Sequence, residues 1–198
     1  MTKNIMIVGV GGQGTLLASR LLGNVITSCG YDLKVSEVHG MSQRGGSVVT
    51  YVRYGEEVFS PIVDKGEADY IIAFEQLEAY RYISYLKKGG TLITNSAQIE
   101  PMPVITGMAE YPTDILDKIK AKNINLIALD ALTSANNAGS AKAVNVVLMG
   151  VTSCLMDFDE EKWNNAIKEC VPAKFLEVNQ KAFELGKKLY NTQRFSQN

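Results

Sequence analysis

Apolar and polar positions follow one another along the chain in blocks that predict strands and helices in turn. Short runs of branched and apolar residues are typical of buried strands, and longer runs with apolar residues at helical spacing are typical of amphipathic helices. The predicted strands are residues 5–10, 33–38, 47–54, 69–74, 91–94 and 125–129. The predicted helices are residues 12–28, 75–86, 112–121, 141–155, 157–170 and 173–190.

This succession predicts an α/β protein, a three-layer α/β/α sandwich around a mostly parallel sheet. Residues 54–56 are typical of a turn, and residues 57–59 are predicted to be a short returning strand. We therefore expect an antiparallel hairpin where a plain nucleotide-binding unit has a helix. The lysines and glycines of residues 87–90 predict the end of a helix. Residues 131–140 are small, polar and rich in alanine and asparagine, and they lead into the predicted helix at residues 141–155.

The length predicts a single domain over residues 1–198, with C-terminal helices at about residues 157–190. The chain has 46% hydrophobic and 21% charged residues and a net charge of -1, so nothing predicts bulk attraction to nucleic acid or a membrane surface. No apolar stretch approaches the roughly 20 residues that span a bilayer. Because the first residues lead into a strand without a secretory signal, a cytoplasmic protein is expected.

The cysteines give no sign of a metal site. Cys29, Cys154 and Cys170 are widely spaced, and the chain has a single histidine. This set contains no zinc or iron–sulfur motif. All three cysteines are predicted to be buried free thiols.

A glycine-rich turn joins the first predicted strand to the first predicted helix. Gly9, Gly11 and Gly14 match the spacing G-x-G-x-x-G, and Gly12 and Gln13 lie inside it. Such glycines allow close backbone approach and direct helix N–H groups toward an anion. The turn is therefore a candidate for a tight structural connection, an anion site or a surface that contacts another chain.

A dinucleotide site needs, in addition, an acid about 20 residues beyond the glycines to bind the ribose. Glu37 lies near that distance, at the end of the second predicted strand. Two features argue against this site: Gly12 and Gln13 add a glycine and an amide to the turn, and the segment after Glu37 is long and polar. A stand-alone dinucleotide-binding module is the alternative hypothesis for this chain.

The segment after Glu37 is the most unusual part of the chain. After Val38 its residues are His39, Gly40, Met41, Ser42, Gln43, Arg44, Gly45 and Gly46. Arg44 is able to pair with a phosphate or carboxylate, or alternatively with Glu37. His39 is a candidate acid–base group, but no partner acid is fixed by spacing, which favours a structural or interface role. Since both bends follow parallel strands, we expect this segment and the glycine turn to meet at one edge of the sheet.

Two residues of the apolar helix near the C-terminus are predicted to have structural roles. Asn145 lies among apolar residues, where a buried amide needs a partner, so it is expected to bond to a neighbouring loop. Gly150 is expected to let another element pack closely.

Several segments, in this order, resemble one family. They are residues 9–14 (GVGGQG), 36–46 (SEVHGMSQRGG) and 54–61 (YGEEVFSP), and the match continues in residues 66–69, 86–90 and 145–150. The glycine turn alone is unspecific, but its combination with residues 42–46 is specific. Over nearly its whole length the chain resembles the gamma-type domain of 2-oxoacid:ferredoxin oxidoreductases.

The resemblance implies a subunit rather than a complete enzyme. Such complexes decarboxylate a 2-oxoacid on thiamine diphosphate, pass electrons through iron–sulfur clusters to ferredoxin and form an acyl-CoA. The resemblance implies that the thiamine diphosphate and the clusters belong to a large catalytic partner subunit, with no cofactor in this chain and only indirect contact with ferredoxin. It also implies a role in completing the assembly and in shaping access for the substrate, expected to be an aryl pyruvate, or for CoA. A surface meant for the partner predicts self-association of the isolated chain.

Overall fold

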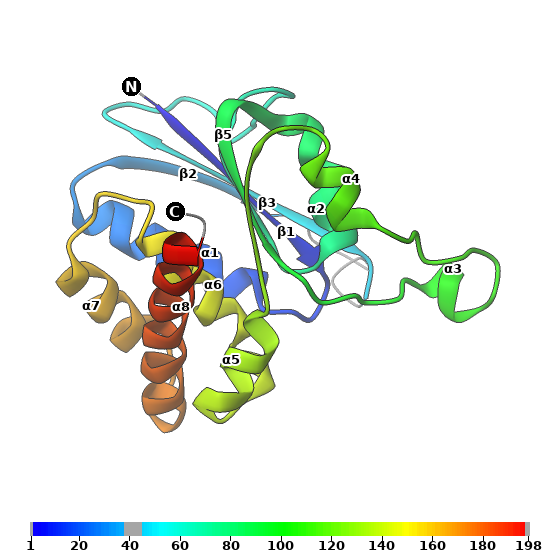
Figure 1. Ribbon diagram of the computed structural model, residues 1–198. Helices are drawn as coiled ribbons and strands as arrows, with labels where there is room; N and C mark the ends of the chain where they lie inside the picture. Colours follow the sequence, from blue (N-terminus) through cyan, green and yellow to red (C-terminus); the bar gives the residue numbers. More distant parts are fainter. Residues whose placement is uncertain (1, 38–44, 197–198) are drawn as a thin grey trace.

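The computed structural model describes residues 2–37 and 45–196, and its strands form one 6-stranded sheet. The strands are β1 (Lys3–Val10), β2 (Asp32–Glu37), β3 (Ser47–Gly55), β4 (Ala68–Ala73), β5 (Leu86–Asn95) and β6 (Asn125–Leu129). Their order is β2-β3-β1-β4-β5-β6 (Figure 1). Parallel pairing joins β1, β4, β5 and β6 in turn, whereas β3 is antiparallel to both β1 and β2. The predicted sheet, mostly parallel with antiparallel character, is confirmed.

The antiparallel hairpin does not lie where it is predicted. It is formed by β2 and β3, and residues 57–59 are not a strand, so the prediction of a returning strand there is wrong. Side chains hold this segment instead of a ladder of backbone hydrogen bonds. The Val58 N–H donates to the Asp32 carboxylate (2.8 Å), and the Arg53 guanidinium donates to the Ile62 carbonyl (2.9 Å).

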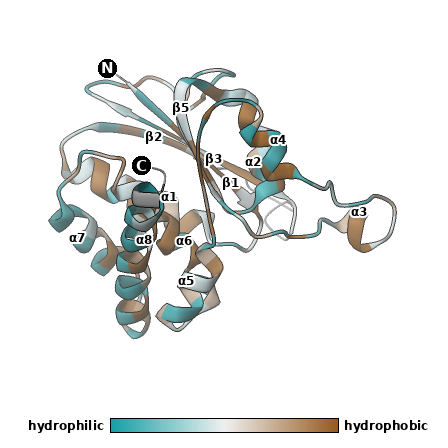
Figure 2. Ribbon diagram, in the orientation of Figure 1, coloured by the Kyte–Doolittle hydropathy of each residue, from teal (hydrophilic) through white to brown (hydrophobic). Residues whose placement is uncertain are grey.

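Helices cover both faces of the sheet, which confirms the three-layer sandwich (Figure 1). On one face lie α1 (Thr15–Ser28), α5 (Ala131–Ala138), α6 (Val144–Ser153), α7 (Glu160–Cys170) and α8 (Leu176–Ser196). On the other lie α2 (Gln76–Tyr82) and α4 (Ile115–Lys120). Because successive strand residues point to opposite faces, β1 supplies both cores. Its Ile5 and Ile7 pack on the α1 side and its Met6 and Val8 on the α2 side, and the brown strands of Figure 2 reflect this double burial.

Two glycines bring α6 and α8 into close contact. A Cβ added at Gly150 lies 2.1 Å from the Phe183 carbonyl oxygen, and one added at Gly186 lies 2.1 Å from the Val147 carbonyl oxygen. The two glycines face each other, since the Gly186 Cα lies 3.2 Å from the added Gly150 Cβ. The prediction that Gly150 permits close packing is confirmed.

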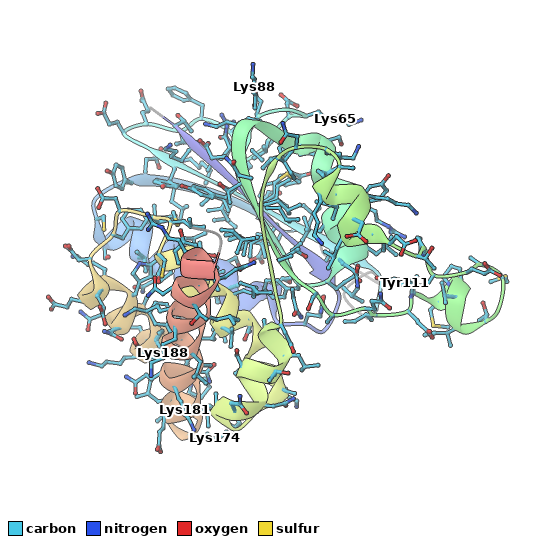
Figure 3. All side chains as sticks on the ribbon, viewed as in Figure 1. Lys65, Lys88, Tyr111, Lys174, Lys181 and Lys188 are labelled. Carbon is cyan, nitrogen blue, oxygen red and sulfur yellow. The ribbon has the colours of Figure 1, made fainter. Side chains whose placement is uncertain are left out.

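The outer side of α8, a helix of 21 residues, is charged. Lys181 and Lys188 are exposed on it and project outward in Figure 3, while Phe183 is buried on the inner side. Among the residues that the structure describes, no helix is both long enough and apolar enough to cross a bilayer.

Residues 131–140, for which the sequence pattern predicts no element, contain α5. Asp130 caps the helix: its carboxylate accepts hydrogen bonds from the Thr133 N–H (2.9 Å) and the Thr133 hydroxyl (2.6 Å). Gly139, with φ 117°, ends it. The alanines favour a helix, and with a cap at each end they outweigh the low propensity of the asparagines.

The prediction of a helix end at residues 87–90 is also wrong, because these residues belong to β5. The preceding helix, α2, ends at Tyr82, and one short 3₁₀ turn connects it to β5. Lys87 forms an ion pair with the buried carboxylate of Asp69 in β4. Gly90 lies tight against β4, with an added Cβ 2.8 Å from the Ala68 carbonyl oxygen, where the pairing register shifts.

The cysteines differ in burial. Cys154 and Cys170 are partly buried free thiols, whereas Cys29 at the end of α1 is exposed. The prediction of burial is therefore wrong for Cys29. The apolar run of α1 ends before this residue, so its side chain has no core to enter.

Candidate functional site

The glycine turn after β1 is closed by its own glutamine. The Val10 N–H donates to Gln13 Oε1 (2.7 Å), and Gln13 Nε2 donates to the Phe74 carbonyl that follows β4 (3.2 Å). The Gln13 amide thus bridges the ends of two adjacent strands. The same amide leaves little space for a side chain at position 9, since a Cβ added at Gly9 lies 2.8 Å from Gln13 Oε1. Gln13 therefore has a structural role in this turn.

Gly14 is required both by backbone conformation and by a close contact. Its φ is 85°, in the left-handed region that favours glycine, and an added Cβ lies 2.4 Å from Asn145 Nδ2. Asn145 is 4% exposed, and its Nδ2 donates to the Gly14 carbonyl (3.1 Å). The prediction that this buried amide bonds to a neighbouring loop is confirmed.

The second bend reaches the glycine turn at Gly46. The Gly11 N–H donates to the Gly46 carbonyl (2.8 Å), and the preceding Gly45 has a φ of 86°. This contact confirms that the two bends meet at one edge of the sheet. The other predicted residues of this bend lie outside the described residues: Val38, His39, Gly40, Met41, Ser42, Gln43 and Arg44.

Glu37 lies further from the glycine turn than a dinucleotide site requires. In the nucleotide-binding order, the strand that carries the ribose-binding acid is the direct neighbour of β1. Here β3 lies between β1 and β2, which moves Glu37 away by one strand spacing, about 5 Å. The Glu37 carboxylate accepts a hydrogen bond from the Ser19 hydroxyl of α1 (2.7 Å). Both observations weigh against the alternative hypothesis of a dinucleotide-binding module.

Two cavities flank the glycine turn. One, of about 300 Å³, lies between the turn, the start of α1 and the start of β3. It is lined by Gly11, Gly12, Gly14, Thr15, Leu16, Val48 and Thr50. The other, of about 550 Å³, lies between the turn, the segment after β5 and the residues before α6. Volumes of this order are typical of small-ligand sites and of clefts that admit a side chain of another protein.

The sequence did not predict that residues of β3 line the smaller cavity. Val48 and Thr50 are two residues apart on β3 and therefore point to the same face. Their alternation was visible in the sequence, but their position depends on the pairing of β3 with β1, in which Ser47 lies opposite Val10. This pairing is non-local and has no short-range signal.

A pair of buried carboxylates, also missed from the sequence, lies beside the second bend. Glu75 is 1% exposed and caps α2, accepting from the Glu78 N–H (2.6 Å) and from the Tyr111 hydroxyl (2.9 Å). Glu78, 3% exposed, accepts from the hydroxyl of Ser47, the first residue of β3. Burial raises the pKa of Glu78, the charge of Glu75 adds to this, and Ser47 and Arg81 oppose it. The pair thus ties the start of β3 to α2.

Glu78→Gln should become more stable relative to wild type as the pH rises. Because the folded pKa is raised, the unfolded chain releases this proton at lower pH, so wild-type stability falls as the pH rises from 4.5 through the folded pKa. Glutamine does not titrate and still accepts from Ser47. Thermal unfolding of both proteins from about pH 4 to about pH 8 measures the effect. A difference in Tm that is constant over this range would contradict it.

Comparison with known proteins assigns the chain to a family. The profile of the pyruvate ferredoxin/flavodoxin oxidoreductase family matches residues 4–189. The chain belongs to this family. The chain matches subunits of other family members along nearly their whole length. Like them, it is a subunit of a 2-oxoacid:ferredoxin oxidoreductase complex.

Its relatives in the pyruvate ferredoxin/flavodoxin oxidoreductase family include subunits from several archaea. The indolepyruvate oxidoreductase subunit IorB of Thermococcus kodakarensis is 48% identical over 190 residues, which covers 93% of this chain and 94% of the relative. The subunit of the same name from Pyrococcus horikoshii is 46% identical over 190 residues, with the same two coverages. The 2-oxoglutarate synthase subunit KorC of Methanothermobacter marburgensis is 31% identical over 193 residues, covering 96% and 97% of the two chains.

Solved structures of the family share this fold. The gamma subunit of a keto/oxoacid ferredoxin oxidoreductase from Geobacter sulfurreducens superposes with a TM-score of 0.71 at 24% identity, covering 96% of this chain and 99% of that one. The 2-oxoglutarate:ferredoxin oxidoreductase of Magnetococcus marinus gives a TM-score of 0.73 at 18% identity. That second match covers 96% of this chain but 31% of the other, so the fold occurs both as a separate chain and as part of a longer one.

Proposed function

We propose that the chain is the small subunit of an indolepyruvate-type complex, which oxidatively decarboxylates aryl pyruvates to acyl-CoA and passes the electrons to ferredoxin. The identities to its relatives support this substrate class. They are 48% and 46% for two subunits named for indolepyruvate, against 31% for one named for 2-oxoglutarate. A subunit named for ketoisovalerate is 29% identical, and the chain spans 35% of its length.

The residues of this chain do not fit an iron–sulfur cluster. Such clusters are typically held by four cysteine thiolates, and the chain has 3 cysteines. Burial raises the pKa of Cys154 and of Cys170, which disfavours the thiolate that binds metal. In the described part of the chain, no group of three or more His, Cys, Asp or Glu side chains is arranged to hold a metal ion. We therefore assign the clusters to the large catalytic partner subunit, and we place the thiamine diphosphate there too because the family resemblance implies it.

The edge formed by the glycine turn and Gly46 is the surface that we assign to this partner. Gln13 and Asn145 account for the shape of the turn through contacts within the chain, which favours an interface over an anion site. Gly12 faces open space, with no atom within 4 Å of an added Cβ, and Leu16 is 38% exposed beside it. The adjoining cavity of about 300 Å³ is placed to shape access for the substrate or CoA.

Leu16→Glu should weaken assembly with the partner by about tenfold or more, because it places a charge in a surface that becomes desolvated. Its stability should change little, since the Leu16 side chain is already 38% exposed. Ile62→Glu is the matched control: Ile62 is 49% exposed and lies between β3 and β4, at the opposite edge of the sheet. Titration of each variant with the partner subunit measures the effect. Equal affinities of the two variants would refute the assignment of this edge.

Reconstitution tests the activity as a whole. The complex of this chain with its large subunit should reduce ferredoxin with indolepyruvate and CoA, and more slowly with pyruvate or 2-oxoglutarate. Omission of this chain should abolish the activity. A complex that prefers 2-oxoglutarate would disprove the substrate class, and activity that does not change when this chain is omitted would disprove its role.

A further inference from the structure

A projection extends from the carboxyl edge of the sheet between β5 and α4. We call residues 98–110, which include the short helix α3 (Met102–Ile105), the arm. Figure 1 shows α3 at the far end of this loop, well away from the rest of the chain, and Figure 2 shows it in brown. The arm is therefore a separate structural feature that the fold itself does not require.

The base of the arm is fixed on both sides to the start of α2. On the outgoing side, the Gln76 N–H donates to the Ala97 carbonyl (3.3 Å), and Gln76 Nε2 donates to the Ser96 carbonyl (3.1 Å). On the returning side, the Tyr111 hydroxyl donates to the buried carboxylate of Glu75 (2.9 Å). Figure 3 labels Tyr111 where the arm rejoins the body. The arm is thus held in a defined direction by two adjacent residues, Glu75 and Gln76.

The tip of the arm is apolar and exposed. Met102 is 60% exposed, Ile105 61% and Met108 78%. Residues 101–109 contain no charged side chain, although 21% of the chain is charged. The hydrogen bonds of this stretch are internal, such as that from the Val104 N–H to the Pro101 carbonyl (2.8 Å) and that from the Met108 N–H to the Pro103 carbonyl (2.8 Å). The tip therefore has its own local structure and offers its apolar side chains outward.

We propose that the arm inserts its tip into an apolar groove on the large catalytic subunit and so anchors this chain in the complex. The inference rests on the proposed function, which supplies that partner. Apolar side chains at a charge-free tip match an uncharged groove, and methionine adapts to the shape of the surface that receives it. A one-turn helix with apolar residues at positions i and i+3 is suited to docking in such a groove.

The arm is continuous with the edge already assigned to the partner. The Asn95 amide at the end of β5 donates to the Phe74 carbonyl (3.2 Å), the same oxygen that accepts from Gln13 of the glycine turn (3.2 Å). The arm leaves the sheet immediately after this junction. A partner seated on the glycine turn therefore lies within reach of the arm, and one protein is able to cover both.

A second copy of this chain fits the tip less well. Outside the arm, large apolar side chains that are exposed in the described chain occur singly or in pairs on separate elements. They are Leu16, Tyr31, Val35, Phe59, Ile62, Tyr80, Leu132 and Phe175. Each of these is a smaller apolar contact than the three side chains of the tip, which favours a groove on a different protein.

The test replaces Met102, Ile105 and Met108 together by serine and measures the affinity for the large subunit. We expect binding about 100-fold weaker than for wild type, since exposed apolar anchors that become buried carry most of an interface's affinity. The control replaces Phe59 and Ile62 by serine; these residues are 85% and 49% exposed on the opposite edge, and affinity should change by less than about twofold. Circular dichroism and Tm should match wild type for both variants, because none of the five side chains is in the core.

Three outcomes are distinguishable. Wild-type affinity of the arm variant for the large subunit overturns the proposal. Loss of self-association by the isolated chain, with unchanged affinity for the large subunit, also overturns it and assigns the arm to a second copy. If the arm variant fails to bind while the wild-type complex turns over a different 2-oxoacid, the docking role stands and only the proposed substrate class fails.

Discussion

Replacing Gly150 with alanine is expected to lower the free energy of unfolding by about 3 kcal/mol or more. The added Cβ lies 2.1 Å from the Phe183 carbonyl oxygen, which is backbone and is not able to rotate away. Relief requires α8 to move as a unit, and α8 also packs on α5 and carries the buried Ala182 and Phe183. Gly186→Ala should cost a similar amount, because its Cβ meets the Val147 carbonyl oxygen at the same distance.

Gly23→Ala in α1 is the matched control for Gly150→Ala. Gly23 is also buried inside a helix, but its added Cβ meets only the flexible end of Leu33, at 3.2 Å. Alanine favours a helix by about 1 kcal/mol over glycine, so this variant should lie within about 1 kcal/mol of wild type. Urea unfolding of the variants gives the comparison. A loss for Gly150→Ala no greater than that for Gly23→Ala would show that the α6–α8 contact is not tight.

The sequence predicts those parts of the fold that depend on local pattern. The apolar strands lie close to the predicted places, but β5 begins at Leu86, before the predicted residue 91, and α5 is not predicted. Gly150 is expected to allow another element to pack closely, because a glycine inside an apolar helix has no side chain of its own. Its partner Gly186 was not identified, since the contact joins helices far apart in the sequence. The hairpin is misplaced for the same reason: the pattern predicts a strand at residues 47–54, but it does not show that this strand is the neighbour of both β1 and β2.

The candidate site, like the fold, has parts that the sequence predicts and parts that it does not. The glycine turn follows from spacing, and its contact with Gly46 follows from the rule that sites lie at the carboxyl edge of a parallel sheet. The buried pair Glu75 and Glu78 was missed because charged residues in a helix normally face water. The bonds that permit their burial come from Tyr111 and Ser47, on two distant segments, so only the folded chain reveals them.

Gly14→Ala should destabilise the chain by about 3 kcal/mol, through two separable effects. One is the left-handed backbone, with φ 85°, and the other is the clash between the new Cβ and Asn145 Nδ2 at 2.4 Å. Gly12→Ala isolates the first effect, since Gly12 has φ 98° but no atom within 4 Å of an added Cβ. Gly12→Ala should therefore cost about 1 kcal/mol. Urea unfolding of both variants measures the difference.

A double-mutant cycle with Asn145→Ala isolates the second effect. Asn145→Ala alone removes the hydrogen bond to the Gly14 carbonyl and should cost about 1 kcal/mol. In that background the new Cβ of Gly14→Ala no longer meets the amide, so its cost should fall to that of Gly12→Ala. The coupling between the two sites then measures how firmly α6 fixes the start of α1 and, with it, the edge assigned to the partner. If Gly14→Ala costs the same in both backgrounds, backbone conformation alone requires this glycine, and α6 does not position the turn.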